Sequence, residues 1–193
     1  MKNVSPDAST EQSELKRAGP IPNSYWLIDD VLLAGEYPGS SDDDAARDKL
    51  TKCLDAGIRT FIDLTEKSEP LTRYDGLLRA LSAERGIETK HIRIAVRDKS
   101  VPHERQLMTR ILTTVRDETT AGRPVYVHCW GGIGRTGTVV GCWLVESGMT
   151  GVEAIARIAE LRANTSDRFT RSPETDPQRR YICDWRSGSV DGA

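Results

Sequence analysis

Cysteine and histidine are too sparse in this chain for the site classes that depend on them. The four cysteines have neither the paired spacing of a zinc site nor the density of a disulfide framework. They are Cys53, Cys129, Cys142 and Cys183, and the three histidines are His91, His103 and His128. Because the histidines form no cluster along the sequence, we expect no metal and no cofactor.

Long apolar runs are also absent. The longest, Val139–Val145, contains a glycine and is far shorter than the ~20 residues that cross a bilayer. Residues 1–23 are polar and lack the apolar segment of a secretory signal. We therefore expect a flexible lead-in over residues 1–22, a single domain over 23–186 and a tail over 187–193. A reducing, cytoplasmic location fits these features, and no membrane partner is expected.

Charge of neither sign dominates the sequence. Lysine and arginine total 27 against 29 acidic residues, which gives a net charge of −2 and a pI of about 6.0. This balance excludes a general attraction to nucleic acid or to an anionic membrane. One local group of cations near the C-terminus is either a solvated face or a surface for acidic or phosphorylated partners. It consists of Arg168, Arg171, Arg179 and Arg180.

Short β-rich segments alternate with helical periodicities along the chain. This alternation predicts an α/β fold: a single domain of three layers, with a mainly parallel central sheet flanked by helices. The expected strands are Tyr25–Ile28, Val31–Ala34, Thr60–Leu64, Ile87–Ile94 and Val125–His128. The expected helices are Asp42–Ala56, Tyr74–Arg85, His103–Thr120, Arg135–Ser147, Gly151–Arg162 and Asp176–Asp184. The loops after three of these strands should meet at the carboxyl edge of the sheet, where such folds bind ligands.

The most informative motif is the glycine-rich loop between the strand ending at His128 and the helix that follows. A loop of this kind turns several backbone N–H groups inward, and the positive end of the helix dipole adds to their field. The same field favours the thiolate of Cys129, which is the nucleophilic form of the side chain. We therefore expect a phosphate-binding loop with a nucleophile at its floor, and His128 behind it as a support.

Two further side chains of the loop suit phosphoryl transfer. The planar guanidinium of Arg135 can pair with two phosphate oxygens at once. The hydroxyl of Thr136 is expected to hydrogen-bond the sulfur of Cys129 and to help it leave from a phosphocysteine intermediate.

The Cys-(x)5-Arg-Ser/Thr pattern of residues 129–136 resembles the signature of the protein tyrosine phosphatase superfamily. The short length of the chain and the sequence pattern His-Cys-x-Gly-Gly-x-Gly-Arg most resemble those of the dual-specificity branch, particularly of cyclin-dependent-kinase-associated phosphatases. The resemblance covers about Tyr25 to Trp185. It implies that phosphate or another oxyanion is bound by Trp130, Gly131, Gly132, Ile133, Gly134 and Arg135.

The resemblance also implies a general acid on a loop some thirty residues before the cysteine. Asp98 lies at that spacing, after a strand-like run, and is the candidate. Because this acid must be protonated while Cys129 is ionised, we expect a bell-shaped pH profile with an acidic optimum.

A glutamine that positions the hydrolytic water is a third element of several family members. Gln178 is the candidate. Its segment also has the pattern of a helix start. In that reading Ser172 or Thr175 caps the helix and Pro173 or Pro177 occupies its first turn. Both readings can hold together.

The expected reaction is hydrolysis of phosphotyrosine in proteins, with phosphoserine and phosphothreonine as a second class and small phosphomonoesters as further substrates. The alternative is a phosphoinositide or inositol-polyphosphate phosphatase. The uncharged loop disfavours it, although Lys67, Arg97 and Lys99 could supply charge from neighbouring loops. Trp130 either braces the loop or faces an aromatic leaving group, and Glu66 is either a surface charge or a contact of Arg135.

Other protein classes share parts of this pattern. A phosphate-binding pseudophosphatase usually lacks the nucleophile, the arginine or the acid, and all three are present here. A sulfurtransferase would have no use for Asp98 or Thr136. An arsenate reductase or low-molecular-weight phosphatase would have the reverse order of cysteine loop and acid.

Overall fold

The computed structural model describes residues 17–186, so the expected tail 187–193 and residues 1–16 of the expected lead-in lie outside the described residues. Residues 17–22, the rest of that lead-in, pack against the domain. Ala18 forms an isolated β-bridge with Tyr25, and the side chain of Ile21 is buried.

A five-stranded sheet forms the centre of the described chain, in the order β1-β2-β5-β3-β4. The strands are β1 Ser24–Ile28, β2 Leu32–Gly35, β3 Thr60–Asp63, β4 Lys90–Arg93 and β5 Val125–His128. β1 pairs with β2 in antiparallel fashion, whereas the other three pairings are parallel. The predicted mainly parallel sheet is confirmed.

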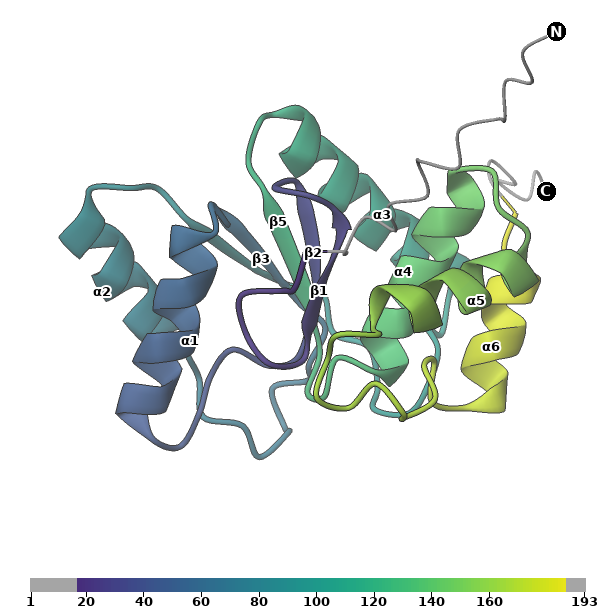
Figure 1. Cartoon of the computed structure of the whole chain (residues 1–193), viewed down its shortest axis with the longest axis horizontal. Helices are drawn as coiled ribbons and strands as arrows, with labels where there is room; N and C mark the ends of the chain where they lie inside the picture. Colours follow the sequence, from purple (N-terminus) through teal and green to yellow (C-terminus); the bar gives the residue numbers. More distant parts are fainter. Residues whose placement is uncertain (1–16, 187–193) are drawn as a thin grey trace, which may run out of the picture.

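Helices cover both faces of this sheet, as Figure 1 shows. The first face carries α1 Asp43–Asp55 and α2 Asp75–Arg85, which pack on Leu33, Phe61 and Tyr126. The second carries α3 Arg105–Thr120 and α4 Gly134–Glu146. α5 Gly151–Leu161 and α6 Asp176–Cys183 pack against α4. Residues that alternate along β3 and β5 therefore contribute to two separate cores, which makes the three predicted layers.

Most elements lie within two residues of their predicted bounds. The exception is β4, which was predicted over Ile87–Ile94 and pairs only over Lys90–Arg93. Gly86 has a left-handed conformation (φ 63°) that ends α2, and the N–H of Ile87 donates to the carbonyl of Ser82. Ile87 thus belongs to the cap of α2, so the strand can begin only after it.

The parallel strands place their following loops at one edge of the sheet. The loops after β3, β4 and β5 are joined there by backbone hydrogen bonds from Leu64 N to His128 O (2.9 Å) and from Val96 N to Leu64 O (3.0 Å). The glycine-rich loop that the sequence predicts to bind phosphate follows β5, so it lies at this edge. Within the described range, none of the helices has the length and apolar character that crossing a membrane requires.

Candidate active site

The loop between β5 and α4 is fixed by close contact with the end of β2. Gly132 has φ +73°, and a Cβ atom there would lie 2.4 Å from the carbonyl carbon of Gly35. The N–H of Tyr37 donates to the carbonyl of Trp130 at 2.7 Å. Glycine is therefore required at position 132 both by its conformation and by the space available.

Cys129 lies at the floor of this loop, with a buried side chain. α4 begins five residues later, and no side chain caps its first turn. The N–H groups of that turn are therefore available to an anion held above the sulfur. Trp130 is half exposed at the rim, Gly131 is exposed and Ile133 is partly buried.

The side chain of Arg135 is buried and oriented by a carboxylate from the loop after β3. Its Nη1 donates to Oε1 of Glu69 at 2.5 Å and its Nη2 donates to Oε2 at 2.9 Å. Nη1 also donates to the carbonyl oxygens of Val96 (3.1 Å) and Leu64 (3.4 Å). This bidentate pair fixes the plane of the guanidinium.

The pair also sets the charge of both partners. Burial alone would raise the pKa of Glu69, but the hydrogen bond from Arg135 lowers it. Burial alone would likewise lower the pKa of Arg135, and Glu69 together with the charge of Cys129 raises it. Both groups are therefore ionised at neutral pH.

Glu69 was missed by the sequence analysis, which considered Glu66 as the contact of Arg135. The backbone N–H of Glu66 instead donates to Oε1 of Glu69 at 2.7 Å. Both residues lie on one turn after β3, in which Glu69 N donates to Glu66 O at 3.2 Å. Only the three-dimensional path of the turn decides which of its carboxylates faces Arg135.

Asp98 is brought to the site as predicted. Its Oδ1 lies 3.0 Å from Nη2 of Arg135, and its side chain is 49% exposed. It belongs to a tight turn in which Ser100 N donates to Arg97 O at 3.1 Å, and Lys99 has a left-handed backbone (φ 54°). The three candidate groups for phosphoryl transfer, Cys129, Arg135 and Asp98, thus come from the loops after β5 and β4 to one place.

Thr136 is fully buried, and its hydroxyl has no hydrogen-bond partner in the described part of the chain. The predicted hydrogen bond from Thr136 to the sulfur of Cys129 is therefore not formed in this structure. An unpaired buried hydroxyl is uncommon, because leaving it without a partner costs free energy. It remains available as a donor when the charge on the sulfur changes.

Gln178 is a capping residue of α6 in this structure. Its Oε1 accepts from the N–H of Thr175 (3.1 Å), and its backbone N–H donates to Oγ1 of Thr175 (3.3 Å). Thr175 is the N-cap and Pro177 lies in the first turn, which confirms one form of the helix-start reading. Nε2 of Gln178 donates to the carbonyl of Ser100 at 3.0 Å, so the side chain connects α6 to the loop of Asp98.

The ring of His128 lies between the loop backbone and the hydroxyl of Tyr74. Its Nδ1 lies 3.3 Å from the carbonyl oxygen of Cys129 and its Nε2 lies 2.6 Å from the hydroxyl of Tyr74. Burial lowers the pKa of His128 to about 4, so the ring is neutral. Because a carbonyl only accepts, the proton resides on Nδ1, and Nε2 accepts from Tyr74.

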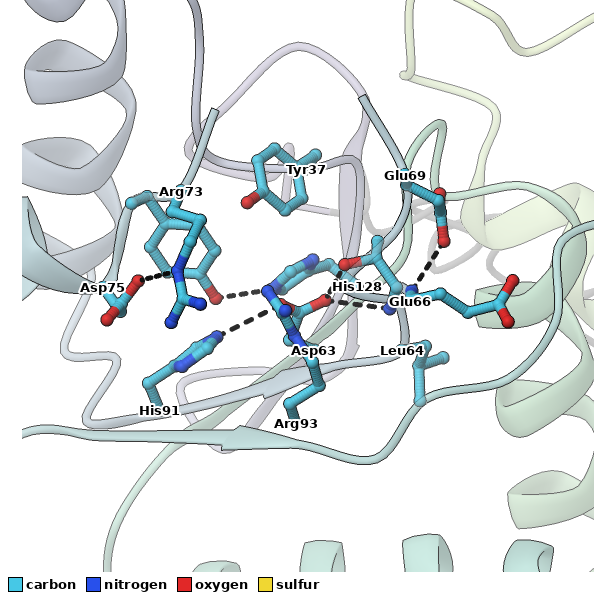
Figure 2. A network of polar contacts seen from close by, with 12 residues as sticks. Tyr37, Asp63, Leu64, Glu66, Glu69, Arg73, Asp75, His91, Arg93 and His128 are labelled. Carbon is cyan, nitrogen blue, oxygen red and sulfur yellow. Dashed lines mark hydrogen bonds and ion pairs between the residues drawn. The ribbon is translucent and has the colours of Figure 1, made fainter. Parts of the chain in front are cut away.

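A buried carboxylate that the sequence did not reveal, Asp63, lies opposite His128 in the sheet (Figure 2). Oδ1 of Asp63 accepts from the backbone N–H (2.9 Å) and hydroxyl (2.6 Å) of Thr65. Oδ2 lies 3.1 Å from Nε2 of His91 and accepts from Nη2 of Arg93 at 2.8 Å. Burial would raise the pKa of Asp63, but these hydrogen bonds hold it well below its usual range. Asp63 is thus an ionised anchor beneath the loop that carries Glu69.

Comparison with known proteins places this geometry in a family. The family model described as "PTP-SAK: Swiss Army Knife protein, DSP-PTPase phosphatase domain" matches residues 22–179. The phosphatidylglycerophosphate phosphatase PTPMT2 of Arabidopsis thaliana is 28% identical over 140 residues, which are 72% of this chain and 55% of that protein. The chain spans about half the length of the first curated relatives that it matches.

Solved structures show the same fold at low sequence identity. Kinase-associated phosphatase has a TM-score of 0.60 at 20% identity, with 78% of this chain and 83% of that chain covered. TpbA of P. aeruginosa has a TM-score of 0.62 at 13% identity, with 86% of this chain and 87% of that chain covered. Because the family model covers most of the sequence, the chain belongs to the family that this model describes, with a domain of the DSP-PTPase type in the protein tyrosine phosphatase superfamily.

Proposed function

We propose that the chain hydrolyses phosphotyrosine in proteins, with phosphoserine and phosphothreonine as a second class, through a phosphocysteine intermediate. The observation that carries the proposal is the convergence of Cys129, Arg135 and Asp98, with Asp98 3.0 Å from the guanidinium. A nucleophile, a bidentate cation and an acid are the three groups that the reaction needs.

In the first step, the thiolate of Cys129 attacks phosphorus while the leaving oxygen departs. Of the five N–H groups of Arg135, those on Nη1 and one on Nη2 are directed at Glu69 and at backbone carbonyls. Nε donates to no atom of the described residues, and Nη2 also lies 3.0 Å from Oδ1 of Asp98. We assign Nε and Nη2 to two phosphate oxygens, so that binding displaces Asp98 from Arg135 toward the leaving oxygen, which it protonates.

In the second step, water attacks the phosphocysteine and phosphate is released. Asp98, now ionised, takes the proton of that water, and the sulfur of Cys129 leaves as a thiolate. The unpaired hydroxyl of Thr136 is the proposed donor to this sulfur. Gln178 can place the water only if its side chain leaves Thr175 and Ser100, so we propose that its role depends on movement of the Asp98 loop.

Two features favour protein substrates over the alternative. The loop residues 130–134 are uncharged, whereas a polyphosphorylated ring would be matched by cations within the loop. TpbA, which has the same fold, has been solved with phosphotyrosine. PTPMT2 is a phosphatidylglycerophosphate phosphatase, so a lipid phosphate is the second candidate substrate. The exposed side chains of Lys67, Arg97 and Lys99 would supply positive charge for it.

The test is phosphate release without added metal from a panel of substrates. The panel contains p-nitrophenyl phosphate, phosphotyrosine and phosphoserine/threonine peptides, a phosphoinositide and inositol hexakisphosphate. We expect hydrolysis of the aryl phosphates by the wild-type chain and none by Cys129→Ser. Preference for the phosphoinositide would support the second candidate, and silence on all substrates would contradict both.

A further inference from the structure

Outside the site, one groove of the described surface combines the most exposed apolar side chains with four arginines. It has a volume of about 450 Å³ and lies between α5 and the loop that leads to α6. We call it the α5 groove and define it by Val152, Ile155, Arg168, Phe169, Arg171 and Arg179 among its lining residues.

The apolar part of the α5 groove is unusually exposed. Phe169 is 89% exposed and Val152 is 73% exposed, more than any other large apolar side chain of residues 17–186. Both line the same groove, and the guanidinium of Arg168 lies 4.5 Å from the ring centroid of Phe169. Large apolar side chains that gather at one exposed place mark a contact surface rather than ordinary surface scatter.

The charge of the α5 groove has one sign. Four arginines line it, and no carboxylate does within the described residues. Arg162 is buried and donates to Asp167, and Arg171 pairs with Asp176, so these two are already compensated. Arg168 and Arg179 form no ion pair with any described residue, which leaves two cations to attract an acidic ligand.

The α5 groove adjoins the phosphate-binding loop. Ser172 lines the groove, and its hydroxyl donates to the carbonyl of Ile133 at 2.8 Å. A Cβ atom at Gly137, in the first turn of α4, would lie 2.5 Å from that hydroxyl. Figure 1 shows the loop between α5 and α6 passing the start of α4. One wall of the groove is therefore in direct contact with the loop that carries Cys129.

We propose that the α5 groove binds an extended acidic segment of the phosphoprotein substrate, next to the phosphorylated residue. Carboxylates of the segment face Arg168 and Arg179, and one large apolar side chain packs on Phe169 and Val152. The proposal rests on the proposed function, since it adds the sequence preference of the same enzyme. It commits to a protein, because a lipid headgroup or a small phosphate would have no use for the apolar half of the groove.

The test compares two phosphotyrosine peptides of equal length. One carries aspartates and a leucine beside the phosphotyrosine, and the other carries serine and alanine at the same positions, with a series that varies their spacing. At the best spacing we expect the acidic peptide to have a KM about tenfold lower at equal kcat, with the difference shrinking as salt is added.

Variants then test whether the preference for the acidic peptide depends on the α5 groove. The double variant Arg168→Gln with Phe169→Ala should lose it and should hydrolyse p-nitrophenyl phosphate like the wild type. The matched control is Arg110→Gln, which changes an exposed arginine of α3 and should keep the preference. Both changes are on the surface, so folding is checked by an unchanged thermal midpoint.

The outcomes separate this proposal from the proposed function. Equal KM values for the two peptides at every spacing would overturn the proposal that the α5 groove binds the substrate. A preference that survives in the double variant would overturn it too. Loss of phosphoinositide-vesicle hydrolysis in the double variant, without a peptide effect, would assign the groove to lipid and also overturn it. Absence of p-nitrophenyl phosphate hydrolysis by the wild type would instead contradict the proposed function.

Discussion

At the residue scale, the orientation of one guanidinium decides what the loop can bind. Arg135 is buried, and its position depends on Glu69 more than on its own neighbours in sequence. Two parallel hydrogen bonds restrict the guanidinium to one plane. In the proposed mechanism, the carboxylate of Glu69 therefore sets where the phosphate oxygens bind to Arg135.

Replacing Glu69 with glutamine should lower kcat/KM for p-nitrophenyl phosphate by about 10–100-fold, since a misplaced guanidinium loses transition-state contacts. Glu66→Gln is the matched control on the same turn, because Glu66 contacts Glu69 only through its backbone N–H and carbonyl. Steady-state kinetics of both variants provides the measurement. Equal activity in Glu69→Gln and Glu66→Gln would show that Glu69 has no positioning role.

The neutrality of His128 has a consequence for stability. Its pKa is about 4 in the folded chain against 6.5 without burial, because burial disfavours the charged ring. The unfolded chain therefore binds this proton first as the pH falls. The resulting stabilisation is complete above about pH 6.5 and is lost progressively as the pH falls toward 4.

Between pH 7 and pH 5, the free energy of unfolding should fall by about 2 kcal/mol through His128 alone. His128→Asn removes the titration while keeping an amide N–H for the carbonyl of Cys129. Urea unfolding at the two pH values should therefore give a shallower pH dependence for the variant than for the wild type. Identical slopes would mean that His128 is not buried in its neutral form.

At the scale of elements, the site is a junction of loops from three parallel strands and the end of β2. β3 supplies the turn of Glu69, β4 leads to Asp98 and β5 ends at His128. Asp63 lies opposite both Arg93 and His128 in the parallel registers. The carboxyl edge of the sheet thus collects groups that are far apart in sequence.

The contact between Gly132 and β2 tests this junction. Gly132→Ala should lower kcat/KM by more than about 100-fold, because a Cβ would meet Gly35 at 2.4 Å and a positive φ is unfavourable for alanine. Gly131→Ala should lose much less, since its nearest neighbour would be 3.5 Å away. Kinetics with p-nitrophenyl phosphate checks this, and similar losses in both variants would contradict the packing argument.

At the scale of the whole molecule, the sequence patterns that predicted the fold are local. The contacts that complete the site join residues far apart in the sequence. The glycine-rich loop, the helix caps and the strand patterns are encoded within a few residues, so they could be identified in sequence. Glu69 lies 66 residues from Arg135, and Tyr74 lies 54 residues from His128. No local pattern relates such pairs, and only the parallel register brings them together.

Asp98 was found because the family resemblance fixed its spacing, not because its local sequence is distinctive. Gln178 shows the reverse case. Its local sequence predicted a helix start, and the structure uses its amide for that cap and for the loop of Asp98. Its proposed part in water placement requires its side chain to leave Thr175 and Ser100.

In the proposed reaction, Cys129 forms a covalent bond to phosphorus. The most direct measurement is mass spectrometry of the acid-quenched enzyme during turnover of p-nitrophenyl phosphate, followed by peptide mapping. We predict one phosphoryl group on Cys129 in the wild type and none in Cys129→Ser. A phosphoryl group on another residue, or turnover with no phosphoenzyme and undiminished activity in Cys129→Ser, would contradict the account.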